Sequence, residues 1–205
     1  MDISKINIEN PESKVIERAV EIILSGGSVV LPTDTAYGLA VNAQDRRAVK
    51  KLFEIKSRPK TSPIPIAVSG LEQAYRLAFF NKQALILAKK FWPGALTLVL
   101  PKKKIVPDEV AGFGSTIGLR IPDSRICFAL ARKLQVPYTI TSANLSGGET
   151  PYSASMIFKE FHKRRLKPDL VLDGGNLPQR EASTVVDLSN NKIKVLRKGP
   201  VKIEF

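Results

Sequence analysis

Three cations stand close together in residues 54–70 of the 205-residue chain, EIKSRPKTSPIPIAVSG. Lys56, Arg58 and Lys60 have no acidic residue between them, and three prolines in the stretch restrict its backbone. Positive charges held together in this way attract an anion. The anion would be a solvent counter-ion, a nucleic-acid backbone or the phosphates of a small molecule, and the stretch alone leaves these three open.

Polar side chains also follow a predicted strand, the place where α/β sheets usually bind ligands. In LPTDTAYGLA the strand ends at a proline, and a tight turn closed by Gly38 carries Thr33, Asp34, Thr35 and Tyr37. These groups either bind a small polar ligand or satisfy the backbone of the turn, and the sequence favours neither.

Three further stretches place polar groups in strands or at their ends. TITSANLSGG runs from a β-branched strand into Ser142 and Asn144 and then two glycines, which suit a ligand approached by backbone or a simple turn. STIGLRIP puts Thr116 and Arg120 on one face by period two, and an arginine in an apolar strand needs an internal or a bound carboxylate. The last stretch, EASTVVDLS…VLRKGP, carries Ser183, Thr184 and Arg197.

Several kinds of site are excluded by the sequence. Neither G-x-x-x-x-G-K-[ST] nor G-x-G-x-x-G occurs, so a bound nucleotide would be held by side chains and other loops. One cysteine and one histidine cannot build a Cys/His zinc site or a disulfide framework. Cys127 lies in an apolar-patterned helix and is expected to be a packed thiol, whereas His162 lies among cations and is not expected to be catalytic.

The charge balance favours a polyanionic partner. The formal net charge is +13, from 32 Lys plus Arg against 19 Asp plus Glu, and the excess is clustered in KSRPK, PKKKIVP, HKRRLKP and RKGPVK. The lysine run 102–104 is equally compatible with a solvated surface loop and with a contact to RNA. No apolar run approaches the ~18–20 residues that span a bilayer, and the polar start does not resemble a signal peptide. A cytoplasmic protein without a membrane partner is expected.

Hydrophobic periodicity predicts the elements that must position these residues. Helices are expected over 10–27 with Asn10 as cap, 45–56, 71–80 with a Ser69–Glu72 capping box, 81–91 opened by Asn81, 124–134 and 153–164. Strands are expected over 5–9, 28–32, 63–68, 96–101, 116–122, 138–143, 169–173, 183–189 and 192–198. The strand-rich end argues against a purely parallel sheet, so the prediction is a mixed α/β sheet flanked by helices in one domain, 1–205.

The ordered set LPTDTAYGLA, KSRP, TSANLSG, STVVD and LRKG resembles the YrdC-domain family, the threonylcarbamoyl-AMP synthases. The resemblance runs from about residue 16 to 199. Any one of these motifs alone is weak evidence for the family, but the complete set in this order is specific to it. It implies a twisted mixed sheet with a deep, positively charged cavity. It also implies an enzyme that combines L-threonine, bicarbonate or CO2, and ATP into threonylcarbamoyl-AMP, with release of pyrophosphate. The product would serve threonylcarbamoyl modification of adenosine 37 in tRNA, with tRNA or a tRNA-threonylcarbamoyl transferase complex as partner.

The resemblance also implies roles for individual residues. The threonine site falls on Thr35, Tyr37, Arg120, Ile140 and Ser183. The ATP site falls on Lys56, Arg58, Ser62, Thr116, Ser142, Asn144, Thr150 and Arg197. The residues closest to catalysis would be Lys56, Arg58, Ser142 and Asn144. Mg²⁺ would arrive with ATP and need few or no dedicated protein ligands.

The chain departs from the family pattern at some positions, and its composition is compatible with other functions. Ala36, Ala40 and Ser62 are smaller or differ from the usual residue, and Ala67 stands where some members place a substrate-side histidine. The chain ends soon after LRKGP, as in the single-domain form. A non-catalytic RNA-binding protein of the same fold is the main alternative. Carbamoyl transfer in hydrogenase maturation is disfavoured, because it uses longer proteins with Cys-rich zinc modules.

Overall fold

The computed structural model of the chain describes residues 1–190 and 192–203. One group of strands is β1 (Asp2–Lys5), β2 (Val29–Pro32), β3 (Tyr37–Ala40), β8 (Thr141–Ser142) and β9 (Leu170–Asp173). A second group is β4 (Ile66–Ala67), β5 (Leu96–Pro101), β6 (Thr116–Arg120), β7 (Tyr138–Thr139), β10 (Thr184–Asp187) and β11 (Lys194–Arg197). The helices are α1 (Ser13–Leu24), α2 (Arg46–Ile55), α3 (Leu71–Leu77), α4 (Lys82–Phe91), α5 (Arg125–Leu134) and α6 (Ala154–Phe161).

The strands form two sheets rather than the single sheet expected. One has the order β1-β9-β2-β3-β8 and the other the order β11-β10-β5-β6-β4-β7. Each sheet contains parallel and antiparallel pairs, for example parallel β1–β9 with antiparallel β2–β3, and parallel β10–β5 with antiparallel β5–β6. The predicted mixed α/β class with flanking helices is confirmed.

One predicted strand is divided between the two sheets. Residues 138–143 form β7, which pairs with β4, and β8, which pairs with β3. The chain changes sheet at Ile140, whose N–H donates to the carbonyl of Pro65 at 2.8 Å. This crossing joins the sheets at the point where their polar faces meet.

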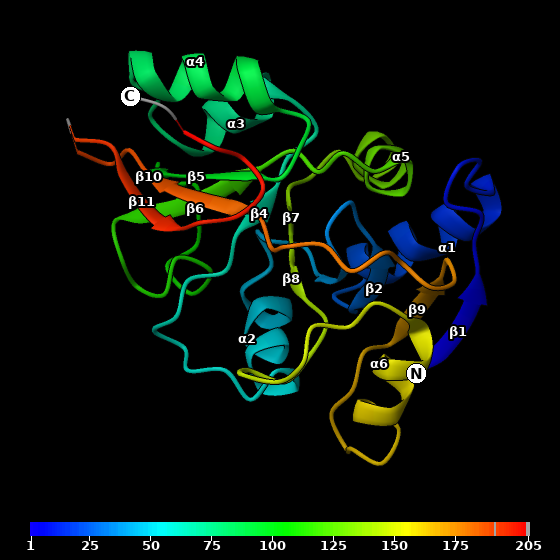
Figure 1. Cartoon of the computed structure of the whole chain (residues 1–205). Helices are drawn as coiled ribbons and strands as arrows, with labels where there is room; N and C mark the ends of the chain where they lie inside the picture. The colour runs from blue at the N-terminus through cyan, green and yellow to red at the C-terminus, as the bar shows by residue number, and fades with distance from the viewer. Residues whose placement is uncertain (191, 204–205) are drawn as a thin grey trace.

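Helices cover one face of the six-stranded sheet and leave the other face for a site. Figure 1 shows α3 and α4 above β5, β6 and β10. Alternate residues of β5 and β6 enter the core on that side, among them Leu98, Leu100, Ile117 and Leu119, all at 0% exposure. Because strand side chains alternate in direction, the residues between them face the five-stranded sheet.

Four helices begin at a side-chain cap, and two predicted caps are wrong. Asp45, Asn81, Ser124 and Ser153 each accept a backbone N–H of the first turn. The predicted cap Asn10 lies before the start of α1, whose N-cap residue makes no side-chain bond. The predicted Ser69–Glu72 box does not form, because α3 begins one residue later with Gly70 at the cap and Glu72 pairs with Arg76.

Two smaller corrections concern strands. The first strand covers residues 2–5 rather than 5–9, and the segment Tyr37–Ala40, expected to be part of a turn, is strand β3 of a hairpin with β2. No helix within the described ranges is long and apolar enough to cross a bilayer.

Candidate functional site

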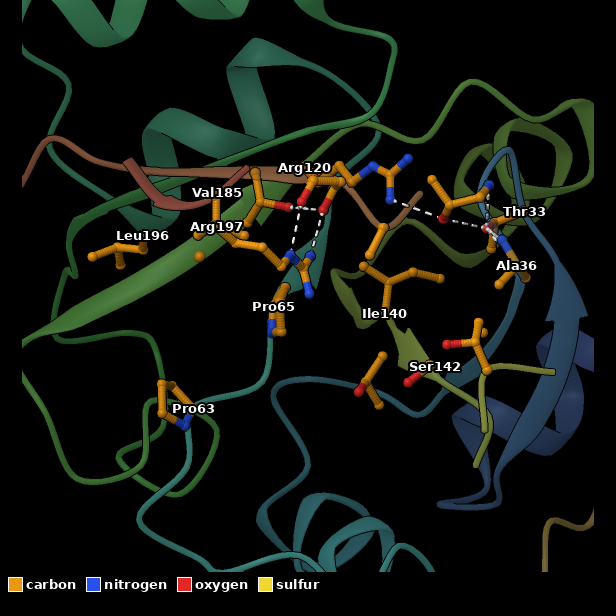
Figure 2. Close-up of a pocket in the computed structure, with 18 of the residues that line it drawn as sticks. Thr33, Ala36, Pro63, Pro65, Arg120, Ile140, Ser142, Val185, Leu196 and Arg197 are labelled. Atoms are coloured by element: carbon orange, nitrogen blue, oxygen red, sulfur yellow. Dashed lines mark hydrogen bonds between the residues drawn. The ribbon is translucent and has the colours of Figure 1, made fainter. Parts of the chain in front are cut away.

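A cavity of about 390 Å³ lies between the two sheets. The β2–β3 hairpin and β8 form one wall, and β5, β6, β10 and β11 form the other (Figure 2). Four arginines line it: Arg58, Arg120, Arg180 and Arg197. Of the lining residues that the structure describes, none is Asp or Glu, while eight positions carry an aliphatic hydroxyl: Thr33, Thr35, Thr97, Thr116, Thr141, Ser142, Thr150 and Ser183. The cavity therefore suits a polyanionic ligand with many hydrogen-bonding groups.

Most of the residues predicted for the site line this cavity. They are Thr35, Tyr37, Arg58, Thr116, Arg120, Ile140, Ser142, Thr150, Ser183 and Arg197. Lys56, Ser62 and Asn144 do not line it. The predicted face of β6 is confirmed, because Thr116, Gly118 and Arg120, at alternate positions of the strand, all line the cavity.

The hydroxyls of the hairpin turn serve two different purposes. Thr33 satisfies the turn, because its Oγ1 donates to the carbonyl of Ala36 at 2.7 Å and accepts from the N–H groups of Thr35 and Ala36. Thr35 instead points its Oγ1 toward Arg120, whose Nη1 lies at 3.3 Å. The hydroxyl of Thr33 therefore satisfies the backbone of the turn, while that of Thr35 faces Arg120. Binding of a ligand by this turn stays a prediction.

Arg120 finds an internal carboxylate. Its Nη2 donates to Oδ2 of Asp34 at 2.6 Å and its Nε to the carbonyl of Gly94 at 2.9 Å, with the two charged side chains 6% and 9% exposed. The other oxygen of Asp34, Oδ1, is buried and has no hydrogen-bond partner among the described residues. Arg120 thus lines the cavity with its positive charge largely offset by Asp34.

Arg197 and Ser183 are joined on the wall formed by the six-stranded sheet, the wall that also carries Arg120. The Nη2 of Arg197 donates to Oγ of Ser183 at 3.0 Å and its Nε to the Ser183 carbonyl at 2.9 Å. The Ser183 hydroxyl also bonds the Oγ1 of Thr97 at 2.9 Å. Burial, together with the like charge of Arg120, lowers the pKa of Arg197 from its usual value. A bound anion would relieve this repulsion.

Lys56 lies beneath the cavity wall rather than in it. The side chain is 1% exposed, and its Nζ donates to the carbonyls of Ser142 and Asn144, the latter at 2.7 Å, and toward Oδ1 of Asn144 at 3.4 Å. Burial lowers its pKa to about 8. An ammonium held in this way fixes the loop that presents Ser142. The predicted contact of Lys56 with phosphate stays a prediction.

Asn144 completes the same network. Its Oδ1 accepts from the Ser142 Oγ at 2.6 Å and its Nδ2 donates to the carbonyl of Gly148 at 2.7 Å. Asn144 therefore orients Ser142 without lining the cavity. Ser62 also lies outside the lining, and its carbonyl accepts from Nε of Arg58 at 3.3 Å.

Ser57, which has a left-handed backbone conformation, makes the side chains of Lys56 and Arg58 point in different directions. Helix α2 ends with Ser57 at φ +48°, while the N–H of Arg58 bonds the carbonyl of Phe53 at 2.9 Å and that of Ser57 the carbonyl of Glu54. This is a Schellman-type ending with a non-glycine residue in the left-handed position. The turn sends Lys56 inward and Arg58 into the cavity, where burial lowers the pKa of its guanidinium.

Substitutions at Ser57 test this turn. Ser57→Gly is expected to raise the free energy of unfolding by about 0.5–1 kcal/mol, because glycine adopts positive φ without a Cβ clash. Ser57→Val is expected to lower it by about 1–2 kcal/mol, because a β-branched residue tolerates this conformation poorly. Urea unfolding of both variants checks the prediction. Equal stability of the two would show that the turn does not require positive φ.

Tyr37 is among the residues that line the cavity, and its hydroxyl bonds backbone groups. The hydroxyl donates to the carbonyl of Gly175 at 2.7 Å and accepts from the N–H of Gly174 at 3.0 Å. Burial raises the pKa of Tyr37 to about 12. The phenol is therefore protonated at neutral pH and ties β3 to the segment that follows β9.

Other residues noted in the sequence lie away from the cavity. Cys127 is buried and its thiol pKa is raised to about 11 by burial, which confirms a packed thiol. His162 stacks on Phe158 and bonds its carbonyl. Ala67 is 0% exposed within the core, paired between β6 and β7, so its small side chain is explained by packing. In the lysine run, Lys102 pairs with Asp108 at 2.8 Å.

Sequence reasoning missed three polar residues of the site. Arg180 lies in a segment with no recognised motif, Thr97 lies in a strand that looked wholly apolar, and Asp34 was noted only as part of a turn. The pairing of Asp34 with Arg120 joins segments far apart in the sequence, so no local signal could show it. Among the described residues, no three His, Cys, Asp or Glu side chains gather where they could hold a metal ion.

Comparison with known proteins gives consistent matches along the chain. The Sua5_yciO_yrdC family model, described as Telomere recombination, matches residues 21–199. The threonylcarbamoyl-AMP synthase of Pyrococcus abyssi is 39% identical over 97% of this chain and 58% of its own length. A putative threonylcarbamoyl-AMP synthase of Methanocaldococcus jannaschii is 38% identical over 96% of this chain and 91% of its own length.

Solved structures agree with these matches. The crystal structure of P. abyssi Sua5 complexed with L-threonine superposes with a TM-score of 0.91 at 38% identity, covering 97% of this chain and 58% of that one. Escherichia coli YciO superposes with a TM-score of 0.89 at 31% identity, covering 98% of each chain. The chain thus spans 58% of the length of the Pyrococcus protein and nearly all of YciO.

Proposed function

The chain belongs to the Sua5/YciO/YrdC family, and from this premise we propose that it is an L-threonylcarbamoyl-AMP synthase. It would combine L-threonine, bicarbonate or CO2, and ATP, and release pyrophosphate. The observation that carries the proposal is the cavity lined by arginines and hydroxyls between the sheets, in a chain related to proteins of that name. The product would pass to a transferase that modifies adenosine 37 of tRNA in the cytoplasm.

The reaction needs charge neutralisation more than proton transfer. The free amino group and CO2 give a carbamate anion and one proton, which passes to water. One oxygen of the carbamate attacks the α-phosphorus of ATP, and the bond from that phosphorus to the pyrophosphate oxygen breaks. Nucleophile and electrophile are both anionic, so fixed cations and in-line positioning supply most of the rate. Arg58 and Arg197, neither of which pairs with a carboxylate among the described residues, would neutralise the phosphates.

The remaining polar groups would orient the reactants. Thr35 from the hairpin wall, and Arg120 and Ser183 from the wall of the six-stranded sheet, would hold the amino acid. The hydroxyl of Ser142, held by Asn144 and Lys56, would contact the nucleotide. Tyr37 keeps its proton at neutral pH, and no general base is required because the attacking carbamate oxygen is already an anion.

We also propose that Mg²⁺ binds together with ATP. Since the described lining offers hydroxyls and no carboxylate, phosphate oxygens and water would supply its ligands, as is common for this ion with nucleotides. Its chemistry would be neutralisation of phosphate charge. The protein side chains would position the phosphates around it.

Pyrophosphate release tests the function. With ATP and Mg²⁺ present, release is expected only when L-threonine and bicarbonate are both added, and omission of either is expected to lower it to background. A chain that binds RNA and releases no pyrophosphate under any of these conditions would support the alternative, a non-catalytic RNA-binding protein. The family relatives and the arginine-lined cavity do not favour that alternative over the synthase.

A further inference from the structure

The segment 174–182, which connects β9 to β10, brings Arg180 to the cavity. It leaves β9 in the five-stranded sheet and crosses to β10 in the six-stranded sheet, drawn in orange in Figure 1. Its backbone is tied at several points. Leu177 N–H bonds the carbonyl of Tyr152 at 2.8 Å, and the Tyr152 hydroxyl donates to the carbonyl of Arg180 at 3.0 Å. The position of Arg180 is therefore set by the fold, although its side chain is exposed.

Arg180 lies at the hairpin end of the cavity. Its Nη1 donates to the backbone carbonyl of Asp34 at 3.2 Å, directly before Thr35. Thr35 and Arg120 meet at the same place. The other two lining cations are held elsewhere, with Arg58 on the carbonyl of Pro63 and Arg197 on Ser183. Arg180 is thus next to the groups that would hold the amino acid.

The two arginines at the hairpin end of the cavity differ in the positive charge that they offer to a ligand. The guanidinium of Arg120 is paired with the carboxylate of Asp34 at 2.6 Å, so it offers directed N–H groups but little net charge. Arg180 contacts only a neutral carbonyl among the described residues. An anionic group placed beside Thr35 would be poorly neutralised by Arg120 and well neutralised by Arg180.

We propose that Arg180 binds the carboxylate of the amino-acid substrate, beside Arg120. The inference rests on the proposed function, because it takes an amino acid as the ligand. It assigns the phosphates to Arg58 and Arg197 and the carboxylate charge to Arg180. The residue would act on binding of the amino acid and not on binding of ATP.

Binding of L-threonine and of L-threoninamide, measured by calorimetry, tests the proposal. Arg180→Gln keeps most of the side-chain length and a hydrogen-bond donor but removes the charge. It is expected to weaken L-threonine binding by ~10-fold or more, as for a lost charge-assisted hydrogen bond. Binding of L-threoninamide, which has no carboxylate, is expected to stay within ~2-fold of wild type. Arg180→Lys is expected to restore part of the loss.

Kinetics and a matched control separate the outcomes. In pyrophosphate release, Arg180→Gln is expected to raise the KM for threonine and leave the KM for ATP unchanged, while Arg165→Gln, an exposed arginine after α6, changes neither. If the wild type is active and Arg180→Gln binds threonine as tightly as the wild type does, the role of Arg180 is wrong but the proposed function stands. A raised KM for ATP, or equal weakening of threoninamide, leads to the same conclusion. A wild type that neither binds threonine nor releases pyrophosphate overturns the proposed function as well.

Discussion

Arg58→Ala is expected to slow pyrophosphate release by at least about 100-fold, the usual cost of removing one preorganised group that stabilises developing charge. Arg58 is half-buried in the cavity wall, and its guanidinium bonds two neutral carbonyls, those of Ser62 and Pro63. Its charge is therefore available to the phosphates. Because no internal carboxylate depends on it, the free energy of unfolding should change by less than about 1 kcal/mol.

Lys60→Ala is the matched control for this variant. Lys60 has the same charge, stands two residues away and is exposed outside the cavity lining, so its removal is expected to leave turnover within about 2-fold. Arg58→Lys should recover only part of the rate, because an ammonium cannot make the forked contact of a guanidinium. Near-normal release by Arg58→Ala, or an equal loss in Lys60→Ala, would contradict the assignment of Arg58.

The comparison of Lys56 with Arg58 shows how far sequence reasoning reaches into the site. Both cations belong to one short motif, and the sequence could predict that the motif forms a cavity wall. Their opposite directions depend on the left-handed conformation of Ser57. No glycine marks that position, so the sequence contains no sign of the turn. The sequence could therefore predict that this motif lies at the cavity, but not which of Lys56 and Arg58 faces into it.

Strand alternation made other parts of the site predictable. Thr116 and Arg120 could be placed on one face because the period of a strand is fixed by its geometry. The partner of Arg120 could not be chosen, since an internal and a bound carboxylate satisfy the same requirement. Asp34 fills that place from a hairpin 86 residues away in sequence, a contact that only the tertiary fold defines.

The fold was predictable where local signals were strong. Helices α2, α4 and α5 combine clear periodicity with a capping side chain, and their predicted positions agree with the structure. The run 138–143 looked like one strand because a period-two pattern does not say which sheet a residue joins. Gly38 suggested a turn, yet it lies in β3, where a Cβ would stand 2.8 Å from Cδ1 of Ile140. A side chain at this position would have to displace the end of the Ile140 side chain.

Lys56→Met is expected to destabilise the protein by about 3 kcal/mol, which distinguishes it from Arg58→Ala. Methionine has a similar length and no donor, so the buried carbonyl of Asn144 and the part-buried carbonyl of Ser142 would lose the ammonium that now satisfies them. The Ser142 loop would lose its support, and turnover should fall together with stability. Unfolding by urea and pyrophosphate release are measured on the same preparations. A variant with wild-type stability and no turnover would show that Lys56 acts directly on substrate.

The pH dependence of this difference gives an independent check. The folded-state pKa of Lys56, about 8, lies below the usual value of 10.5 for an exposed lysine. Between these values the unfolded chain holds more protons at this site than the folded chain, so the contribution of Lys56 to stability rises with pH. The gap in unfolding free energy between wild type and Lys56→Met should therefore be wider at pH 10 than at pH 7. A gap that narrows over this range would mean that the folded protein favours the charged ammonium, as a lysine facing phosphates would require.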